Sequence, residues 1–121
     1  MEISGVLEDL VRREIDRLQV PPTIRGHRYL VYITGQLAAD PGRIEGITKD
    51  LYRETARRFR TNWSAVERSS RVAITCCWES AAGRERFCKL AGYQFTERPS
   101  ISAFTAIVAQ YITENYSIAE D

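Results

Sequence analysis

The stretch from Thr48 to Cys77, TKDLYRETARRFRTNWSAVERSSRVAITCC, holds two amphipathic patterns of helical period that are separated by only a few residues. In the first pattern the apolar stripe is formed by Leu51, Tyr52, Thr55, Ala56 and Phe59. In the second pattern one stripe is formed by Val66, Ser70, Ala73, Ile74 and Cys77. Two helices joined by so short a turn predict a helix-turn-helix over about residues 48–80.

Capping residues indicate where these two helices begin. Thr48 is a good N-cap for the first one, because a threonine hydroxyl can accept a hydrogen bond from a free amide of the first turn. The second helix has two candidate starts, which are Thr61 and the capping box formed by Ser64 and Glu67. We expect this helix to run toward Gly83.

The remainder of the chain also has a helical period, without the strict alternation that is typical of a strand. The first segment, with apolar positions from Leu7 to Leu18, is stopped by Pro21-Pro22. Further helices are predicted over about residues 24–39, over about residues 84–90 with an end at Gly92, and from about Ser100 to Tyr116. The 121 residues therefore predict one all-α domain of about six helices that spans residues 1–121.

The net charge of +1 hides an uneven distribution. Residues 43–71 carry eight basic and four acidic side chains, so this window is strongly positive while the flanking segments are acidic. An anionic partner is therefore expected for the middle of the chain. No apolar run is long enough to cross a bilayer and the first residues lack a signal-peptide pattern, so we expect a cytoplasmic protein with no membrane partner.

The residues that usually form metal or catalytic sites are few. Cys76, Cys77 and Cys88 contain no CxxC pair, and His27 is the single histidine. This set offers neither a metal cage nor a pair of nucleophile and base, so we expect no enzyme activity, no metal and no cofactor. We interpret the cysteines as small buried hydrophobes and His27 as a packed core residue.

The polar face of the second helix carries side chains suited to reading DNA. Arginine can bind guanine with two hydrogen bonds in the major groove, and glutamate can accept from the cytosine amino group. Glu67, Arg68 and Arg71 supply this set from the N-terminal half of a helix. Side chains and free amides around them could hold DNA phosphates. The candidates for phosphate contacts are Lys49, Arg57, Arg58, Arg60, Thr61 and Ser64. The alternative is a solvated helix face with ion pairs such as Glu67 to Arg71.

Several linked motifs in order carry a family resemblance. They are VPPTIRGHRYL at 20–30, GITKDLY at 46–52, ARRF at 56–59, VER at 66–68, Arg71, Ala73-Ile74, Trp78 and Gly92-Tyr93. From about residue 10 to about residue 113 the chain resembles the C-terminal effector domain of the stage-zero sporulation response regulator (sporulation protein A) of endospore-forming Firmicutes.

This resemblance implies an all-α domain of six helices that binds double-stranded DNA. It implies that the fourth helix enters the major groove of a TGTCGAA-like box, with Glu67, Arg68 and Arg71 at the base-reading positions. It also implies tandem copies on DNA and contacts with RNA polymerase through its sigma factor. Both lines of argument favour a sequence-specific transcription regulator.

Two further interpretations concern the whole protein. The few residues before the matching region cannot hold a receiver domain, so we expect either a free-standing relative or a piece of a longer regulator. A rival function is a protein-interaction module that has lost DNA binding and modulates a full-length regulator. The outward set of Glu67, Arg68 and Arg71 speaks against this rival, because a purely structural role gives no reason to keep it exposed.

Overall fold

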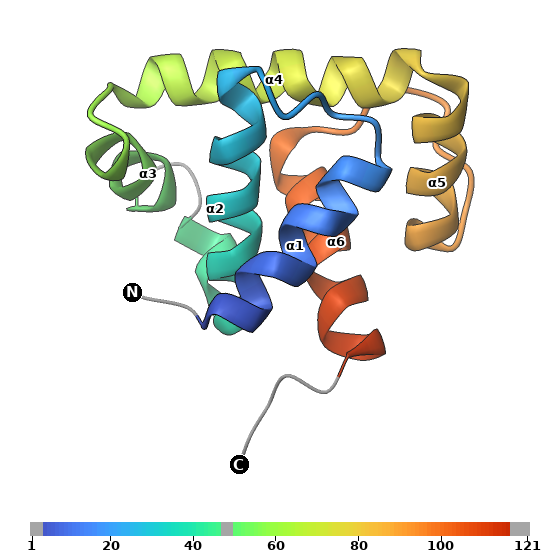
Figure 1. Ribbon diagram of the computed structural model, residues 1–121, viewed down its shortest axis with the longest axis horizontal. Helices are drawn as coiled ribbons and strands as arrows, with labels where there is room; N and C mark the ends of the chain where they lie inside the picture. The colour runs from blue at the N-terminus through green and yellow to red at the C-terminus, as the bar shows by residue number, and fades with distance from the viewer. Residues whose placement is uncertain (1–3, 47–49, 117–121) are drawn as a thin grey trace.

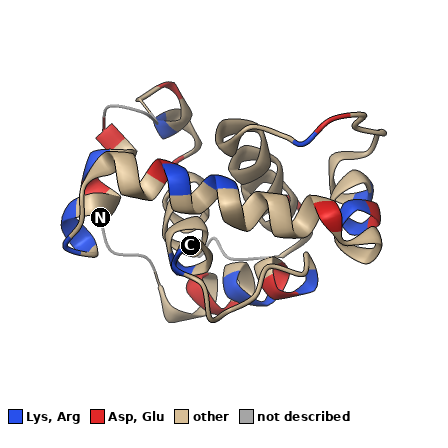
Figure 2. Cartoon of the chain, turned by 90° about the horizontal axis from the view of Figure 1, so that it is seen from above, with Lys and Arg blue, Asp and Glu red and all other residues tan. Residues whose placement is uncertain are grey.

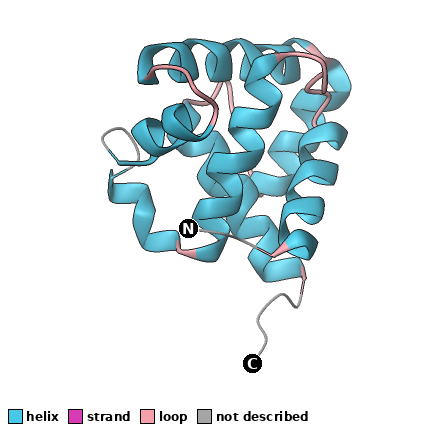
Figure 3. Ribbon diagram, turned by 60° about the vertical axis from the view of Figure 1, so that its left-hand side comes forward, coloured by secondary structure: helices cyan, strands magenta, loops and turns pink. Residues whose placement is uncertain are grey.

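The computed structural model describes residues 4–46 and 50–116, and within these residues it contains helices and turns but no strand (Figure 3). This confirms the all-α prediction. The helices are α1 (Gly5–Arg17), α2 (Arg25–Ala39), the 3-10 helix η1 (Pro41–Gly46), α3 (Tyr52–Arg58), α4 (Trp63–Glu79), α5 (Ala81–Ala91) and α6 (Ile101–Asn115). None of the helices in the described part of the chain has the length and apolar character needed to cross a membrane.

Helix α2 is the centre of the fold. It packs against α1, α4 and α6, and α4 lies across the N-terminal end of α2 (Figure 1). Leu30 and Ile33 of α2 are completely buried, as are Val66 of α4 and Phe104 of α6. The ring of Phe104 stacks on that of Phe87 from α5, with 5.3 Å between the ring centroids. One apolar core therefore joins the helices, which fits a domain of this size.

The N-cap of α4, at the end of the turn that follows α3, is a residue that the sequence patterns did not propose. Asn62, in an extended conformation, is the N-cap of α4, and its side-chain oxygen accepts a hydrogen bond from the Ala65 amide at 2.9 Å. The two predicted starts were therefore wrong: Thr61 precedes the cap and Ser64 is the second residue of the helix. Asparagine is as good an N-cap as serine or threonine, so composition alone could not choose among them.

The boundary between α4 and α5 also differs from the prediction. Helix α4 ends at Glu79 rather than near Gly83, and the Ser80 hydroxyl caps α5 by accepting from the Gly83 amide at 3.1 Å. The later boundaries are confirmed, with Gly92 in the left-handed conformation after α5 and Ser100 as the N-cap of α6. Thr48, the predicted N-cap of α3, lies outside the described residues.

The side chains considered for metal or redox chemistry are packed instead. Cys77 and Cys88 are buried as predicted, whereas Cys76 is only half-buried. Burial raises the pKa of the Cys77 thiol to about 12, so it stays protonated and unreactive at neutral pH. His27 is buried, as predicted, and its Nε2 atom lies 2.7 Å from the Asp16 carboxylate.

A buried carboxylate links α1 to the C-terminal half of the fold. Glu14 is almost fully buried, and both of its oxygens accept hydrogen bonds from Arg86 of α5 at 2.8 Å. These bonds raise the pKa of the arginine, whose guanidinium also lies over the ring of Tyr111 from α6. An ion pair with two parallel hydrogen bonds constrains the relative orientation of its two side chains as well as bringing their charges together. This pair therefore helps to set how α1, α5 and α6 pack.

Gly26 allows α2 and α4 to approach very closely. A Cβ atom at position 26 would lie 2.1 Å from the carbonyl oxygen of Ser69 and 2.8 Å from the Cβ of Ala73, both in α4. The first of these contacts is with backbone, which cannot rotate away. Only glycine therefore fits between the two helices in their present arrangement.

We predict that Gly26→Ala destabilises the domain by at least about 2 kcal/mol, because the added methyl group forces α2 and α4 apart. Gly5→Ala is the matched control, since a Cβ atom there meets no atom within 4 Å. The control should be neutral or slightly stabilising, because alanine reduces the freedom of the unfolded chain. Urea unfolding of both variants measures the difference, and equal midpoints would contradict the account of this crossing.

Candidate nucleic-acid interface

The outward face of α4 is set by the burial of the opposite face. Every residue of the predicted inward stripe is buried, namely Val66, Ser70, Ala73, Ile74 and Cys77. On the opposite side Arg68 and Arg71 are exposed, and Glu67 is half-buried at the edge. Seen from above, α4 crosses the molecule with its basic residues toward its N-terminal half (Figure 2). Val72, beside Arg71, is 53% exposed and adds an apolar surface to this face.

Two of the predicted base-reading side chains are bonded to each other. The Glu67 carboxylate accepts a hydrogen bond from Arg71 at 2.7 Å, so the ion pair that the alternative interpretation names is present on the helix surface. A pair of this kind, four residues apart, contributes about 0.3–0.5 kcal/mol. An arginine that binds guanine with two hydrogen bonds contributes about 1–3 kcal/mol of discrimination. The pair is therefore weak enough to rearrange when a base is offered.

The end of α3 and the turn that follows it, together called the basic turn, present a group of basic side chains. Arg57, Arg58 and Arg60 are exposed, and Arg60 adopts a left-handed backbone with φ of 56° that reverses the chain. The guanidinium of Arg58 lies 5.8 Å from the ring centre of Tyr32, which is within cation–π range. Ser64 is exposed and Thr61 is half-buried, whereas Lys49 lies outside the described residues.

The start of α4 adds backbone donors to this basic turn. The first amides of a helix have no carbonyl partner inside the helix. In α4, the Asn62 side chain satisfies Ala65, so the amides of Trp63 and Ser64 remain for an outside acceptor. Together with the positive end of the helix dipole, they favour a bound anion.

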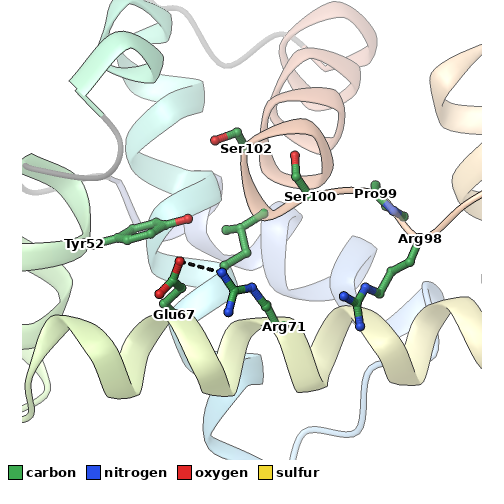
Figure 4. A pocket seen from close by; sticks show the side chains of 8 residues that line it. Tyr52, Glu67, Arg71, Arg98, Pro99, Ser100 and Ser102 are labelled. Atoms are coloured by element: carbon green, nitrogen blue, oxygen red, sulfur yellow. Dashed lines mark hydrogen bonds and ion pairs between the residues drawn. The ribbon is translucent and has the colours of Figure 1, made fainter.

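A polar cleft lies on one flank of α4, where it meets the start of α6 (Figure 4). It has a volume of about 430 Å³. Its lining residues come from α3, α4 and the segment that leads into α6, namely Tyr52, Glu67, Arg71, Arg98, Pro99, Ser100, Ile101 and Ser102. The sequence patterns did not predict that Arg98 and its neighbours line this cleft. These residues lie far from α4 in the sequence, and they show no helical pattern that would place them beside it.

A comparison with known protein families identifies the family of the chain. A family model described as Sporulation initiation factor Spo0A C terminal matches residues 11–112. The chain belongs to this family. The Spo0A C-terminal family is the DNA-binding domain of the sporulation regulator and not an enzyme family. Double-stranded DNA is therefore the partner of this domain, and its function is DNA-binding transcription regulation.

A polar network holds α3 in place within this Spo0A C-terminal domain. Glu54 of α3 accepts a hydrogen bond from Arg43 of η1 at 2.7 Å and another from the Tyr32 hydroxyl of α2. Arg43 also donates to the side chain of Gln36 at 2.9 Å. The helical period of this segment, taken alone, leads one to expect Glu54 on the solvent-facing side, but its side chain is only 23% exposed. The expectation failed because the partners come from two other elements, which a helical wheel cannot show.

Titration of Glu54 should make stability depend on pH. The hydrogen bond from Arg43 lowers the pKa of this carboxyl from its ordinary value of 4.5 to about 2. A carboxyl with a lowered pKa stabilises the fold above its unfolded pKa and loses that contribution as the pH falls toward the folded value. The relevant window therefore runs from about pH 5 down to about pH 2.

We predict that Glu54→Gln lowers the free energy of unfolding by about 1–2 kcal/mol at pH 7, after allowance for solvent screening. The difference from the wild type should shrink as the pH falls from about 5 to 2, because the wild-type carboxyl then becomes protonated. Urea unfolding at a series of pH values measures this. Glu85→Gln, at an exposed position of α5, is the control. A loss for Glu54→Gln that is independent of pH would show that Glu54 acts by packing alone.

Proposed function

We propose that this domain reads a TGTCGAA-like box through the N-terminal half of α4, as a sequence-specific regulator. Arg68 and Arg71 would each bind a guanine in the major groove, and Glu67 would accept from a cytosine amino group. The single observation that carries the proposal is the outward placement of these side chains on a helix whose opposite stripe is buried. The family of the chain supports DNA binding.

The basic turn would fix the register of the domain on the duplex. Phosphate contacts position a protein without carrying sequence information, and helix N-termini and arginines are their usual sources. We assign this role to Lys49, Arg57, Arg58, Arg60, Thr61 and Ser64. The exposed arginines and the free amides at the start of α4 support the assignment.

The consequences for transcription follow from DNA binding. We infer that the domain acts in the cytoplasm, changes promoter output through the sigma factor of RNA polymerase, and binds as a tandem dimer where boxes are repeated. A titration with a TGTCGAA duplex and with a scrambled duplex tests the core of the proposal. Preference for the first duplex supports it. Failure to bind either one would instead favour the protein-interaction module.

We predict that Arg68→Ala weakens binding to the TGTCGAA duplex by about 1–3 kcal/mol and changes binding to the scrambled duplex little. Arg68 is exposed on α4 and alanine is the best helix former, so the melting temperature should stay the same. Arg13→Ala removes an equal charge from an exposed position of α1 and is the control. Fluorescence anisotropy provides both affinities. Equal weakening on the two duplexes would mean that Arg68 contacts a phosphate rather than a base.

We also predict a strong dependence of binding on salt. With about four to six phosphates neutralised per domain, the slope of log K against log salt should be roughly −4 to −5. Anisotropy titrations between low and moderate salt give this slope. A slope near zero is incompatible with the proposed phosphate contacts.

A further inference from the structure

The cleft on the flank of α4 contains polar groups that the proposed base and turn contacts do not use. Arg98 donates from Nη1 to the Thr75 hydroxyl at 2.7 Å, and Thr75 in turn donates to the Arg71 carbonyl at 2.9 Å. This chain of bonds holds the guanidinium of Arg98 beside α4. Its other N–H groups make no hydrogen bond among the described residues and stay available at the edge of the cleft.

The hydroxyl of a buried tyrosine opens into the same space. Tyr52 is only 4% exposed, yet among the described residues its hydroxyl has no hydrogen-bond partner. Figure 4 shows this hydroxyl directed across the cleft toward the start of α6. Burial, and next the charge of Glu67, raise the pKa of Tyr52 to about 12, so the group is a donor at neutral pH. Because this hydroxyl can donate and no described protein group accepts from it, it is available to an acceptor that enters the cleft.

The start of α6 forms the opposite wall. The Ser100 hydroxyl is occupied by the Ala103 amide, at 3.0 Å, whereas the amides of Ile101 and Ser102 have no acceptor inside the helix. The positive end of a helix of 15 residues therefore faces the cleft. The one carboxylate in the lining, Glu67, is paired with Arg71, so the charge that remains is the positive charge of Arg98.

We propose that this cleft binds a backbone phosphate of the DNA duplex, held by Arg98, the Tyr52 hydroxyl and the amides of Ile101 and Ser102. The inference rests on the proposed function, because it requires that α4 enters the major groove. A helix in that groove lies between two phosphate backbones. The cleft opens along one flank of α4 (Figure 4), while the turn between α3 and α4 lies at the N-terminal end of α4 (Figure 1). The contact would therefore anchor the domain at a second point along the helix.

Ser102→Asp tests the inference, because it places a negative charge in the cleft at a position where the helix dipole favours it. The fold should therefore be retained, as the melting temperature will show. We expect about tenfold weaker binding to TGTCGAA and scrambled duplexes alike, and a salt slope smaller in magnitude by about one. Ser102→Asn, which is similar in size and uncharged, should bind both duplexes like the wild type. Arg98→Gln should reproduce the loss if the aspartate variant fails to fold.

The outcomes separate this inference from the proposed function. If the wild type binds neither duplex, the proposed function itself fails. If the wild type binds and both Ser102→Asp and Arg98→Gln keep its affinity and salt slope, only the phosphate cleft is wrong. A free phosphate ion could occupy the cleft in place of a DNA phosphate. Titration of inorganic phosphate into the DNA-free domain, followed by NMR, tests this alternative. Saturable phosphate binding that Ser102→Asp abolishes without any effect on DNA would assign the cleft to a free anion and overturn the proposal.

Discussion

The close approach of α2 and α4 at Gly26 is the constraint on which the rest of the structure depends. Because the backbone of α4 touches α2 at this point, there is no room for a side chain between the two helices. A second close approach at Gly83, where a Cβ atom would lie 2.7 Å from the Leu18 carbonyl oxygen, holds the start of α5 against the end of α1. The contact at Gly26 holds α4 against α2 in the orientation that buries its inward stripe, and so keeps the opposite side toward a partner.

The inward face of α4 and the all-α fold could be predicted from the sequence, because both follow from a helical period of apolar residues. Helix starts were less predictable, since Asn62 competes with Thr61 and Ser64 as a cap of similar quality. The contacts of Glu54 with Arg43, and of Arg98 with Thr75, could not be predicted at all. They join residues from different elements, and no local pattern in the sequence encodes such pairs.

The charged side chains of the domain fall into two groups. Some form ion pairs between elements of the fold, and others are exposed near α4, where they can bind anions. The carboxylates of Glu14 and Glu54 are bonded to arginines of other elements, so these charges stabilise tertiary structure. The arginines of the turn before α4 and of its outward face are exposed instead. A net charge near zero is therefore compatible with DNA binding, because the acidic residues neutralise arginines elsewhere in the fold.

The central claim is that the outward face of α4 contacts DNA, and mapping of backbone amide NMR shifts tests it most directly. On addition of a TGTCGAA duplex, we expect the largest shifts in residues 57–72, where the α3–α4 turn leads into the first half of α4. The C-terminal half of α6, at the far end of the molecule from α4, should change little (Figure 1). Large shifts confined to α1 and the C-terminal half of α6, with α4 unchanged, would contradict the account.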